Sequence, residues 1–487
     1  FGILAALATP GLRAAGSAAY RRVFPLDAIR IGAASILYLG IITAVGLYEP
    51  RALRFLALLG AATGVYLLWR ARPSFGVASG LPPGSLNPLP IGPWSDPEFY
   101  KKQAAKYGDV FKASQFGQPM VCVVGLDRAN RLLLEHDHQL VAPPLPFSRF
   151  IEGGYLRYLP EETHANYRRF FRSLFHSEVV ANAEPRIAAA FRRGFSAMSE
   201  QSSARDSVVV KPFVMRMMFV AWSELFYGIG DDHPDFARLK ELFHVIDIRK
   251  ARWASRRRVN VALDEIERII KQRAAVLSAE AGGASCFVAA LARNNPEALD
   301  DRTVLGNLIY IMQVTWGDVT GLLLWVFKML SDNPEWRQRL QRDATRDLAS
   351  RIVRETLRLE QSESRYRRAV ADLELDGFRI PRNWLVRMCI RESHQNESTF
   401  PDPQVFNPDR FVGRTFTRAQ YAPFGAFRLA CIGEELTKVV GALFAIELVS
   451  GFEWKVADDS APEISSWAHN APGSRFSVTM TPKPAVH

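Results

Sequence analysis

The sequence is poor in cysteine and has no paired metal-binding motif. Its 487 residues include four cysteines, Cys122, Cys286, Cys389 and Cys431, and no two of them form a CxxC pair. This pattern argues against a disulfide framework and against a zinc ribbon. The chain also lacks an internal repeat and a GxGxxG phosphate-binding loop, so neither a repeat architecture nor a phosphate loop of that kind is indicated.

A long basic tail is also missing, although the formal net charge is +11. The excess is spread through the chain, mostly as arginine, which fits an anionic membrane surface or an acidic protein partner better than sequence-specific DNA. We therefore expect no nucleic-acid partner. With 48% hydrophobic and 23% charged residues the chain has the composition of a globular protein. Its length is enough for one large domain or for a few average ones.

Two uncharged runs lie near the N-terminus, at residues 31–48 and 55–69. As a helix the first would extend about 27 Å, close to the thickness of one bilayer core. Arginines flank the outer ends of the pair, which places both ends on the cytoplasmic side, although arginines in the connecting loop weaken that assignment. We predict a membrane anchor of two helices over residues 1–72, and a single span followed by an interfacial helix is the alternative.

A linker rich in proline, glycine and serine follows at residues 73–93, and we expect it to form a semi-rigid extended arm. Residues 94–487 form the main domain. Their patterns predict helices at 96–107, 127–135, 164–175, 303–331, 336–359 and 434–452, several amphipathic helices within 186–293, and strands at 110–124, at 365–386 and in the C-terminal tail. The expected fold class is therefore mainly α with small β-sheets.

Two polar stretches resemble sites without forming one. The run Glu135-His136-Asp137-His138 looks like a metal cluster, but adjacent positions on a helix do not converge on one point, so we interpret it as solvated surface. The basic cluster at residues 249–258 fits a membrane surface and a plain solvated face equally well.

One cysteine lies in a position suited to metal binding. Residues 423–433 place Cys431 in a tight apolar loop between Gly425 and Gly433, directly before a predicted helix. A thiolate at a helix N-terminus is favoured by unpaired backbone N–H groups and by the positive end of the helix dipole. Cys431 is therefore a candidate metal ligand, and an ordinary buried cysteine is the alternative.

The later part of the chain carries a series of motifs in a fixed order. D-N-P-E at 332–335 ends the long apolar helix, and E-T-L-R follows at 355–358. A strand then contains Arg367 and Asp372, and His394 precedes F-P-D-P and N-P-D-R-F. The series ends with the cysteine loop, P-F-G…C-I-G. This order, from about residue 81 onward, resembles the cytochrome P-450 family of haem-thiolate proteins. The resemblance implies a P-450 fold, here preceded by a transmembrane helical segment.

The resemblance also implies roles for individual residues. Cys431 would be the axial iron ligand of a b-type haem. His164, Arg168 and Arg367 would face the haem propionates, where guanidinium–carboxylate pairing is strong. Phe424 would belong to the haem-binding loop.

A second implied group is a structural triad. Glu355, Arg358 and Arg410 would form a buried set of ion pairs that braces the haem-binding core.

The long helix departs from the pattern of the family it resembles. The family usually reads A/G-G-x-acid-Thr there, and this chain places Gly317 at the acid and Asp318 at the threonine. If the alignment slides by one residue, Val319 takes the place of the alcohol and Thr320 is the nearest hydroxyl. We predict that Asp318 and Thr320 are the catalytic residues that replace the usual pair.

The cysteine loop departs from the pattern as well. The family usually reads G-x-R/H-x-C, and the corresponding positions here are Phe427 and Leu429, with Arg428 between them. We expect the bulky Phe427 to strain the loop. Arg428 is predicted to bind the cofactor in place of the missing basic residue.

Three functions are compatible with this sequence. The first is a membrane-bound monooxygenase, its haem domain on the cytoplasmic side, that hydroxylates a lipophilic substrate with O2 and electrons from a separate ferredoxin or flavoprotein reductase. The second is a peroxygenase, or an isomerase or dehydratase of oxygenated lipids, because family branches with such chemistry lack the acid–alcohol pair. The third is a degenerate P-450-like subunit of a membrane complex, in which the partners would be membrane lipids and other membrane subunits.

Overall fold

The structure is a computed structural model that describes residues 80–86, 92–115, 118–143, 155–175, 178–247, 256–279, 284–360, 365–465 and 469–484. The predicted membrane anchor at 1–72 and most of the linker at 73–93 lie outside the described residues. Within the described part, one helix is long and apolar enough to cross a membrane by length and composition, and most of it is buried inside the protein.

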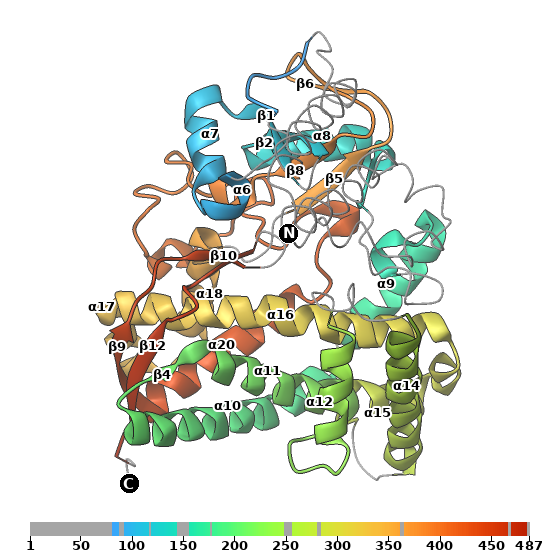
Figure 1. Cartoon of the computed structure of the whole chain (residues 1–487), viewed down its shortest axis with the longest axis vertical. Coiled ribbons are helices and arrows are strands. Elements are labelled where there is room, and N and C mark those ends of the chain that lie inside the picture. The colour runs from blue at the N-terminus through green and yellow to red at the C-terminus, as the bar shows by residue number, and fades with distance from the viewer. Residues whose placement is uncertain are drawn as a thin grey trace, which may run out of the picture.

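That helix, α16 (Arg302–Asp332), is the element around which the helical part is built, and Figure 1 shows it running across the middle of the molecule. The carboxylate of Asp301 caps its start by accepting from the backbone N–H groups of Thr303 and Val304 at 2.7 and 3.3 Å. Asn333 and Pro334 end it. The prediction of a long apolar helix at 303–331 is confirmed.

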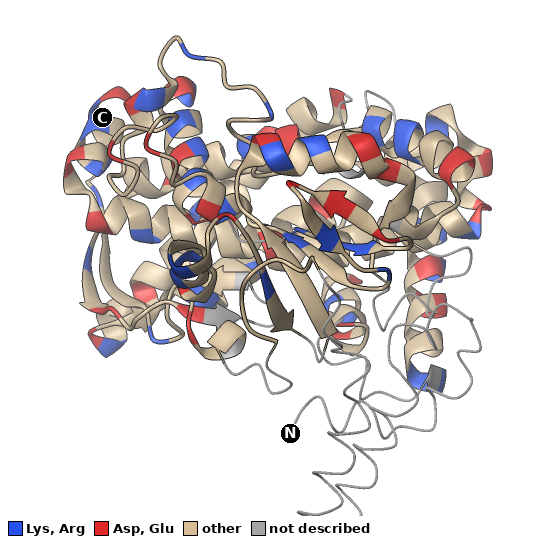
Figure 2. Ribbon diagram, turned by 90° about the horizontal axis from the view of Figure 1, so that it is seen from above, with Lys and Arg blue, Asp and Glu red and all other residues tan. Residues whose placement is uncertain are grey.

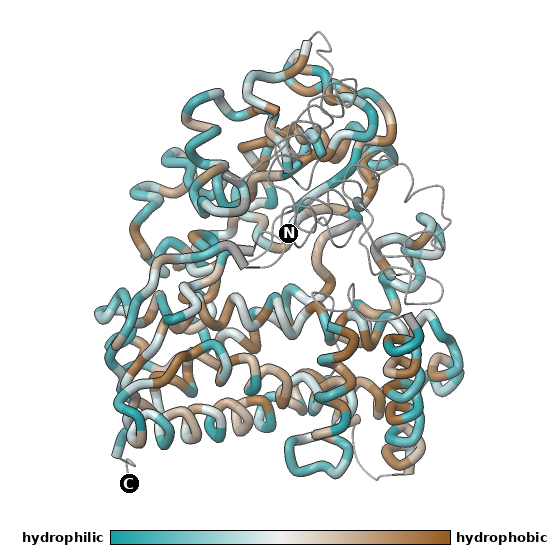
Figure 3. The backbone as a smooth tube through the Cα atoms, viewed as in Figure 1, coloured by the Kyte–Doolittle hydropathy of each residue, from teal (hydrophilic) through white to brown (hydrophobic). Residues whose placement is uncertain are grey.

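The other helices pack against α16, against one another or against the β-sheets. They are α6 (Gly92–Ser95), α7 (Phe99–Tyr107), α8 (Leu126–His136), α9 (Glu161–Phe175), α10 (Glu178–Arg205), α11 (Val210–Tyr227), α12 (Phe236–Val245), α14 (Arg256–Ala279), α15 (Phe287–Asn294), α17 (Pro334–Asp343), α18 (Arg346–Leu359), α19 (Ile390–Ser393) and α20 (Glu434–Gly451). The helices α10, α11 and α20 lie on one side of α16 and form the apolar core with it (Figure 1). Because α14 is amphipathic, Figure 3 shows apolar and hydrophilic bands alternating along it.

The strands form four small sheets. The largest has the order β1 (Val110–Gln115), β2 (Gln118–Val123), β8 (Leu385–Met388), β5 (Arg365–Ala369), β3 (Leu140–Val141), and only β2 and β8 run parallel in it. The others join β4 (Val208–Val209), β12 (Ser477–Pro482) and β9 (Phe452–Asp458), then β10 (Glu463–Ser465) and β11 (His469–Ala471), then β6 (Leu373–Leu375) and β7 (Phe378–Ile380). The helix α8 buries its apolar face, including Leu132 and Leu133, in the cluster that contains this largest sheet.

The mainly α fold with small β-sheets is therefore confirmed, and two of the predicted stretches divide into shorter elements. Residues 336–359 form two helices instead of one, because the chain turns at Ala344 with φ +30° and Thr345 caps the new helix α18. Residues 365–386 form four short strands. Lys and Arg residues are interspersed with Asp and Glu residues along these elements in the described part of the chain, as Figure 2 shows.

Candidate functional site

The cysteine loop, residues 423–433, joins the segment before it to α20. The backbone N–H of Cys431 donates to the carbonyl oxygen of Phe424 at 2.9 Å, which closes the loop. Gly425 takes φ +76°, a conformation that favours glycine. Phe424 is buried in the helical core, and Cys431 packs against the same core. Of the four cysteines the other three are buried and Cys431 is only half-buried, so its thiol is the one placed to meet a ligand.

Phe427 explains how this loop tolerates a bulky residue where the family pattern has glycine. Its φ is +59°, so the backbone keeps the left-handed turn. Its side chain is 42% exposed, so the ring does not fill the interior of the loop. The expected strain therefore lies in the backbone, where a left-handed conformation costs a non-glycine residue about 1–2 kcal/mol.

Three basic groups meet beside the loop. On α9, Nη1 of Arg168 donates to the carbonyl oxygen of Ala430 at 2.8 Å, next to Cys431. His164 lies one helical turn earlier and is buried. Burial lowers the pKa of His164, and the charges of Arg168 and Arg428 lower it further. The charges of both arginines therefore act on the His164 ring.

Arg428 is bound by a residue that the sequence did not single out as functional. Its Nε donates to a carboxylate oxygen of Asp137 at 2.9 Å. Asp137 begins the short helix η2 (Asp137–Gln139), within the run interpreted as solvated surface. His138 fits that interpretation, since it is exposed and pairs with Glu161 at 3.0 Å. Asp137 does not fit it, because the contact with Arg428 spans 291 positions of sequence, and no local pattern could reveal it.

Arg367 comes from a different element, the strand β5, and its side chain is buried. Its Nη1 donates to the carbonyl oxygen of Tyr366 at 2.9 Å. Two residues earlier on the same strand, Arg365 lies 3.6 Å from where a side chain at Gly425 would begin. Because alternate residues of a strand project from one face, β5 brings Arg367 to the side that meets the cysteine loop.

These residues fit a haem with propionate groups. A half-buried cysteine precedes a helix, and basic side chains from α9, β5 and the loop itself surround it. One carboxylate, Asp137, pairs with this basic set through Arg428. Carboxylate groups of a cofactor would find charge-assisted hydrogen-bond donors there.

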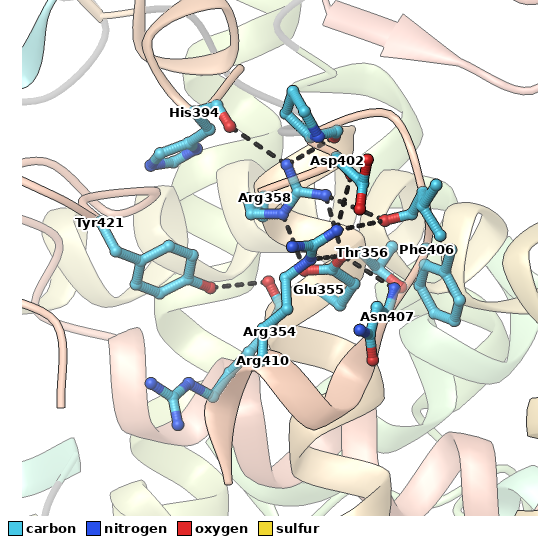
Figure 4. A network of polar contacts seen from close by, with 12 residues as sticks. Arg354, Glu355, Thr356, Arg358, His394, Asp402, Phe406, Asn407, Arg410 and Tyr421 are labelled. Carbon is cyan, nitrogen blue, oxygen red and sulfur yellow. Dashed lines mark hydrogen bonds and ion pairs between the residues drawn. The ribbon is translucent and has the colours of Figure 1, made fainter. Parts of the chain in front are cut away.

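The structure also brings together Glu355, Arg358 and Arg410, as Figure 4 shows. Glu355 and Arg358 lie one turn apart on α18, and both side chains are fully buried. The guanidinium of Arg358 donates twice to the carboxylate at 2.8 Å, and Nε of Arg410 donates at 3.1 Å. The backbone N–H of Asn407 donates to the same carboxylate at 2.9 Å. A buried charge set with this many partners fixes geometry.

His394 connects this network to the cysteine loop. Its carbonyl oxygen accepts from Arg358 at 3.1 Å, and its ring Nε2 accepts from the backbone N–H of Ala422 at 3.2 Å. The ring stacks on Tyr421, with centroids 5.2 Å apart. Burial lowers the pKa of His394 to about 3, and the charge of Arg358 adds to the effect. The ring is therefore neutral and links α18 with the residue that precedes the loop.

The middle of α16 carries a stripe of accessible positions on an otherwise buried helix. Gly317 is exposed, and a side-chain carbon added there would meet no atom within 4 Å. Asp318 and Thr315, three residues apart on one face, are half-buried. The other half-buried positions of this stripe are Tyr310, Ile311, Val314 and Gly321. Because a side chain would fit beside Gly317, no neighbour among the described residues requires a glycine at this position.

Thr320 lies on the opposite side of α16 from Asp318. Its side chain is buried, and its hydroxyl donates to the carbonyl oxygen of Trp316 at 2.6 Å. Residues two positions apart on an α-helix project in directions about 200° apart. The geometry therefore does not support Thr320 as the partner of Asp318. Thr315 is the hydroxyl on the accessible side, and the helical spacing of three would have indicated it from the sequence.

Comparisons with known proteins agree with the fold and with the motifs. The chain is 27% identical over 419 residues to an abscisic acid 8'-hydroxylase from Solanum lycopersicum, covering 77% of this chain and 86% of that protein. It is 25% identical over 428 residues to a taxane 10-beta-hydroxylase from Taxus cuspidata, covering 79% and 84%. A retinoic acid-bound cyanobacterial CYP120A1 structure superposes with a TM-score of 0.67 at 21% identity, over 83% of this chain and all of that one. The family model described as Cytochrome P450 matches residues 91–486, so the chain belongs to the cytochrome P450 family.

Proposed function

We propose that the protein is a haem-thiolate monooxygenase that hydroxylates a lipophilic substrate with O2 and electrons from a separate donor, a ferredoxin or a flavoprotein reductase. Family membership implies a haem whose iron is bound by a cysteine thiolate. The observation that carries the proposal is the loop around Cys431, closed onto Phe424 and flanked by Arg168 and Arg428. The hydroxylases that it resembles act on abscisic acid and taxanes, and both are lipophilic molecules.

Each residue of the site then has a task toward the cofactor, which we propose to be haem b. Cys431 would bind the iron, while His164, Arg168, Arg367 and Arg428 would hold the propionates. Phe424 anchors the loop in the core. When bound, the haem supplies the redox chemistry that activates oxygen. Glu355, Arg358 and Arg410 keep the segment before the loop in place.

Asp318 is the residue we propose for proton delivery on the distal side. It lies on the accessible stripe of α16, beside the open space at Gly317. A carboxyl group at such a place can pass a proton from solvent into the site. Thr315 shares this side, and its hydroxyl oxygen can still accept a hydrogen bond while it donates to the carbonyl oxygen of Ile311 at 2.7 Å. Thr320 has no direct part in this proposal.

The proposed location is a membrane, with residues 1–72 as the anchor, residues 73–93 as the linker and the haem domain, residues 94–487, on the cytoplasmic side. The support is the uncharged runs at 31–48 and 55–69 and their flanking arginines. Membrane lipids and other membrane subunits are the expected partners besides the electron donor.

A second candidate function is a haem protein that uses peroxide instead of O2. Two observations favour it: Gly317 stands where the family usually has an acid, and the hydroxyl of Thr320 is turned away and bonded to Trp316. A degenerate subunit is the third alternative, and it would be non-catalytic, with or without haem.

Turnover with two oxidants discriminates the first two functions. Purified protein is given a panel of terpenoid-like lipophilic compounds, once with O2, NAD(P)H and added redox partners, and once with peroxide alone. The proposal predicts hydroxylated product in the first reaction, and about a tenfold or larger loss for Asp318→Asn that peroxide does not share. Product with peroxide alone would establish the second function, and no product in either reaction would support the degenerate subunit.

A further inference from the structure

The ion pair between Asp137 and Arg428 connects the cysteine loop with an element that the family motifs do not include. Arg428 belongs to the short helix η7 (Phe427–Leu429) of the loop, and Asp137 to η2, which follows α8. The two side chains meet at 2.9 Å and retain 25% and 29% of their exposure. A partly exposed ion pair of this kind contributes little to folding stability. We therefore consider how the ion pair orients the side chain of Arg428.

The contact with Asp137 leaves the two terminal nitrogens of the Arg428 guanidinium available. Arg428 uses Nε for Asp137, and within the described part of the chain its Nη1 and Nη2 nitrogens make no hydrogen bond. A guanidinium presents its donors as a rigid fork, so fixing Nε also fixes the direction of the other two nitrogens. Those two nitrogens form an edge that matches a carboxylate in a bidentate contact.

The charged groups around Arg428 indicate which site its terminal nitrogens belong to. The charge of Arg428 lowers the pKa of His164 and that of Asp137 raises it, so both groups lie near the buried histidine. Arg168, which binds Ala430 beside Cys431, lowers the same pKa. The pair is therefore part of the basic set that faces the proposed cofactor, although the position that usually carries the basic residue of the loop is Leu429.

We infer that Asp137 is a positioning residue that holds Arg428 so that its two terminal nitrogens bind a haem propionate. Arg428 takes over the task of the basic residue that this chain lacks at position 429, and Asp137 sets its direction. This inference rests on the proposed function, because it requires that the chain binds haem. It assigns a role to a segment that the sequence indicated only as surface.

The test measures the rate of haem loss from the purified holoprotein to an excess of a haem-binding acceptor protein. Arg428→Gln is expected to lose haem about tenfold faster, because a charge-assisted hydrogen bond to a propionate is removed. Asp137→Asn is expected to lose haem about threefold faster, since the guanidinium keeps its charge and loses its direction. In the Arg428→Gln background, Asp137→Asn should add nothing, because Asp137 acts through Arg428.

Two further readouts separate positioning from a structural effect. Arg428→Gln should make the reduction potential of the haem more negative, while Arg428→Lys should keep the potential and still lose haem faster, since lysine keeps the charge without the fork. The matched control is Asp231→Asn, which removes the carboxylate of another partly exposed ion pair, with Arg193 at 2.7 Å, that involves neither the cysteine loop nor α9. Its rate of haem loss should stay within twofold of wild type.

Two results would overturn the inference. One is an Arg428→Gln protein that loses haem as slowly as wild type. The other is an Asp137→Asn effect of equal size with and without Arg428. Both leave the proposed function standing. A wild-type protein that binds no haem at all would instead refute the proposed function, and this inference with it.

Discussion

At the scale of single residues, Phe427 and His394 each destabilise the fold locally, Phe427 through its backbone conformation and His394 through the burial of its ring. Phe427 holds a left-handed backbone that glycine adopts freely. His394 buries a ring that must stay neutral, since burial lowers its pKa to about 3. Both lie in or beside the segment that leads to Cys431, so each cost is tied to the shape of the cysteine loop.

Replacing Phe427 by glycine should stabilise the fold. The left-handed backbone costs phenylalanine about 1–2 kcal/mol. Glycine avoids this cost but destabilises the folded state by about 0.5–1 kcal/mol, because it has more conformational entropy in the unfolded chain. We therefore expect a net gain of about 0.5–1 kcal/mol in the free energy of unfolding, measured from denaturant midpoints. Phe427→Ala is the control, because it removes the exposed ring and keeps the strained backbone. An equal gain from alanine would show that the ring, and not φ, is responsible.

His394 should make the protein sensitive to acid. Its folded pKa, about 3, lies below the ordinary value of 6.5, so between these values the unfolded chain binds more protons and stability falls as pH drops from about 6.5 toward 3. Over this whole pH range, protonation of His394 lowers the free energy of unfolding by at most ~5 kcal/mol. Chemical denaturation between pH 7 and pH 4 should show a smaller loss for His394→Gln than for wild type, because glutamine does not titrate. Parallel curves for the two proteins would contradict this account.

At the scale of elements, α18 is joined to the segment before the cysteine loop by buried charges. Glu355 receives donors from Arg358, Arg410 and the backbone of Asn407, and Arg358 also donates to the carbonyl oxygen of Pro403 at 2.8 Å. The network therefore determines where the chain between His394 and Arg410 lies, and the loop follows from that segment (Figure 4).

Glu355→Ala should lower the free energy of unfolding by more than the loss of its own hydrogen bonds would suggest. It leaves the fully buried guanidinium of Arg358 without its carboxylate, and breaking a buried pair costs about 3–5 kcal/mol. We expect a corresponding fall in unfolding free energy and the loss of haem binding. Glu184→Ala removes the carboxylate of an exposed pair with Arg346 at 2.7 Å and serves as the control, with about 1 kcal/mol or less expected. Equal effects of the two variants would contradict the bracing role.

At the scale of the whole molecule, the sequence predicted more of the fold than of the site. The long helix, the strand pair at 110–124 and the helix after Cys431 follow from apolar patterns and capping residues, and the structure contains each of them. The break at Ala344 was missed, because its left-handed turn has no glycine to mark it.

Within the site, the loop motif could indicate Cys431, and a spacing of three on one helix brings Glu355 and Arg358 together. They could not indicate Asp137, whose partner lies 291 residues away. The position of Thr320 on the buried side of α16 also depends on packing, which the sequence alone does not determine.

The central claim is that Cys431 binds the iron of a haem. The most direct measurement is the difference spectrum of the purified protein, reduced and exposed to carbon monoxide. Wild-type protein should give the red-shifted Soret band of thiolate-bound haem, and Cys431→Ala should abolish it, while Cys286→Ala, at a buried cysteine in the helical core, should keep it. A wild-type protein without a haem band, or a red-shifted band that persists in Cys431→Ala, would contradict the account.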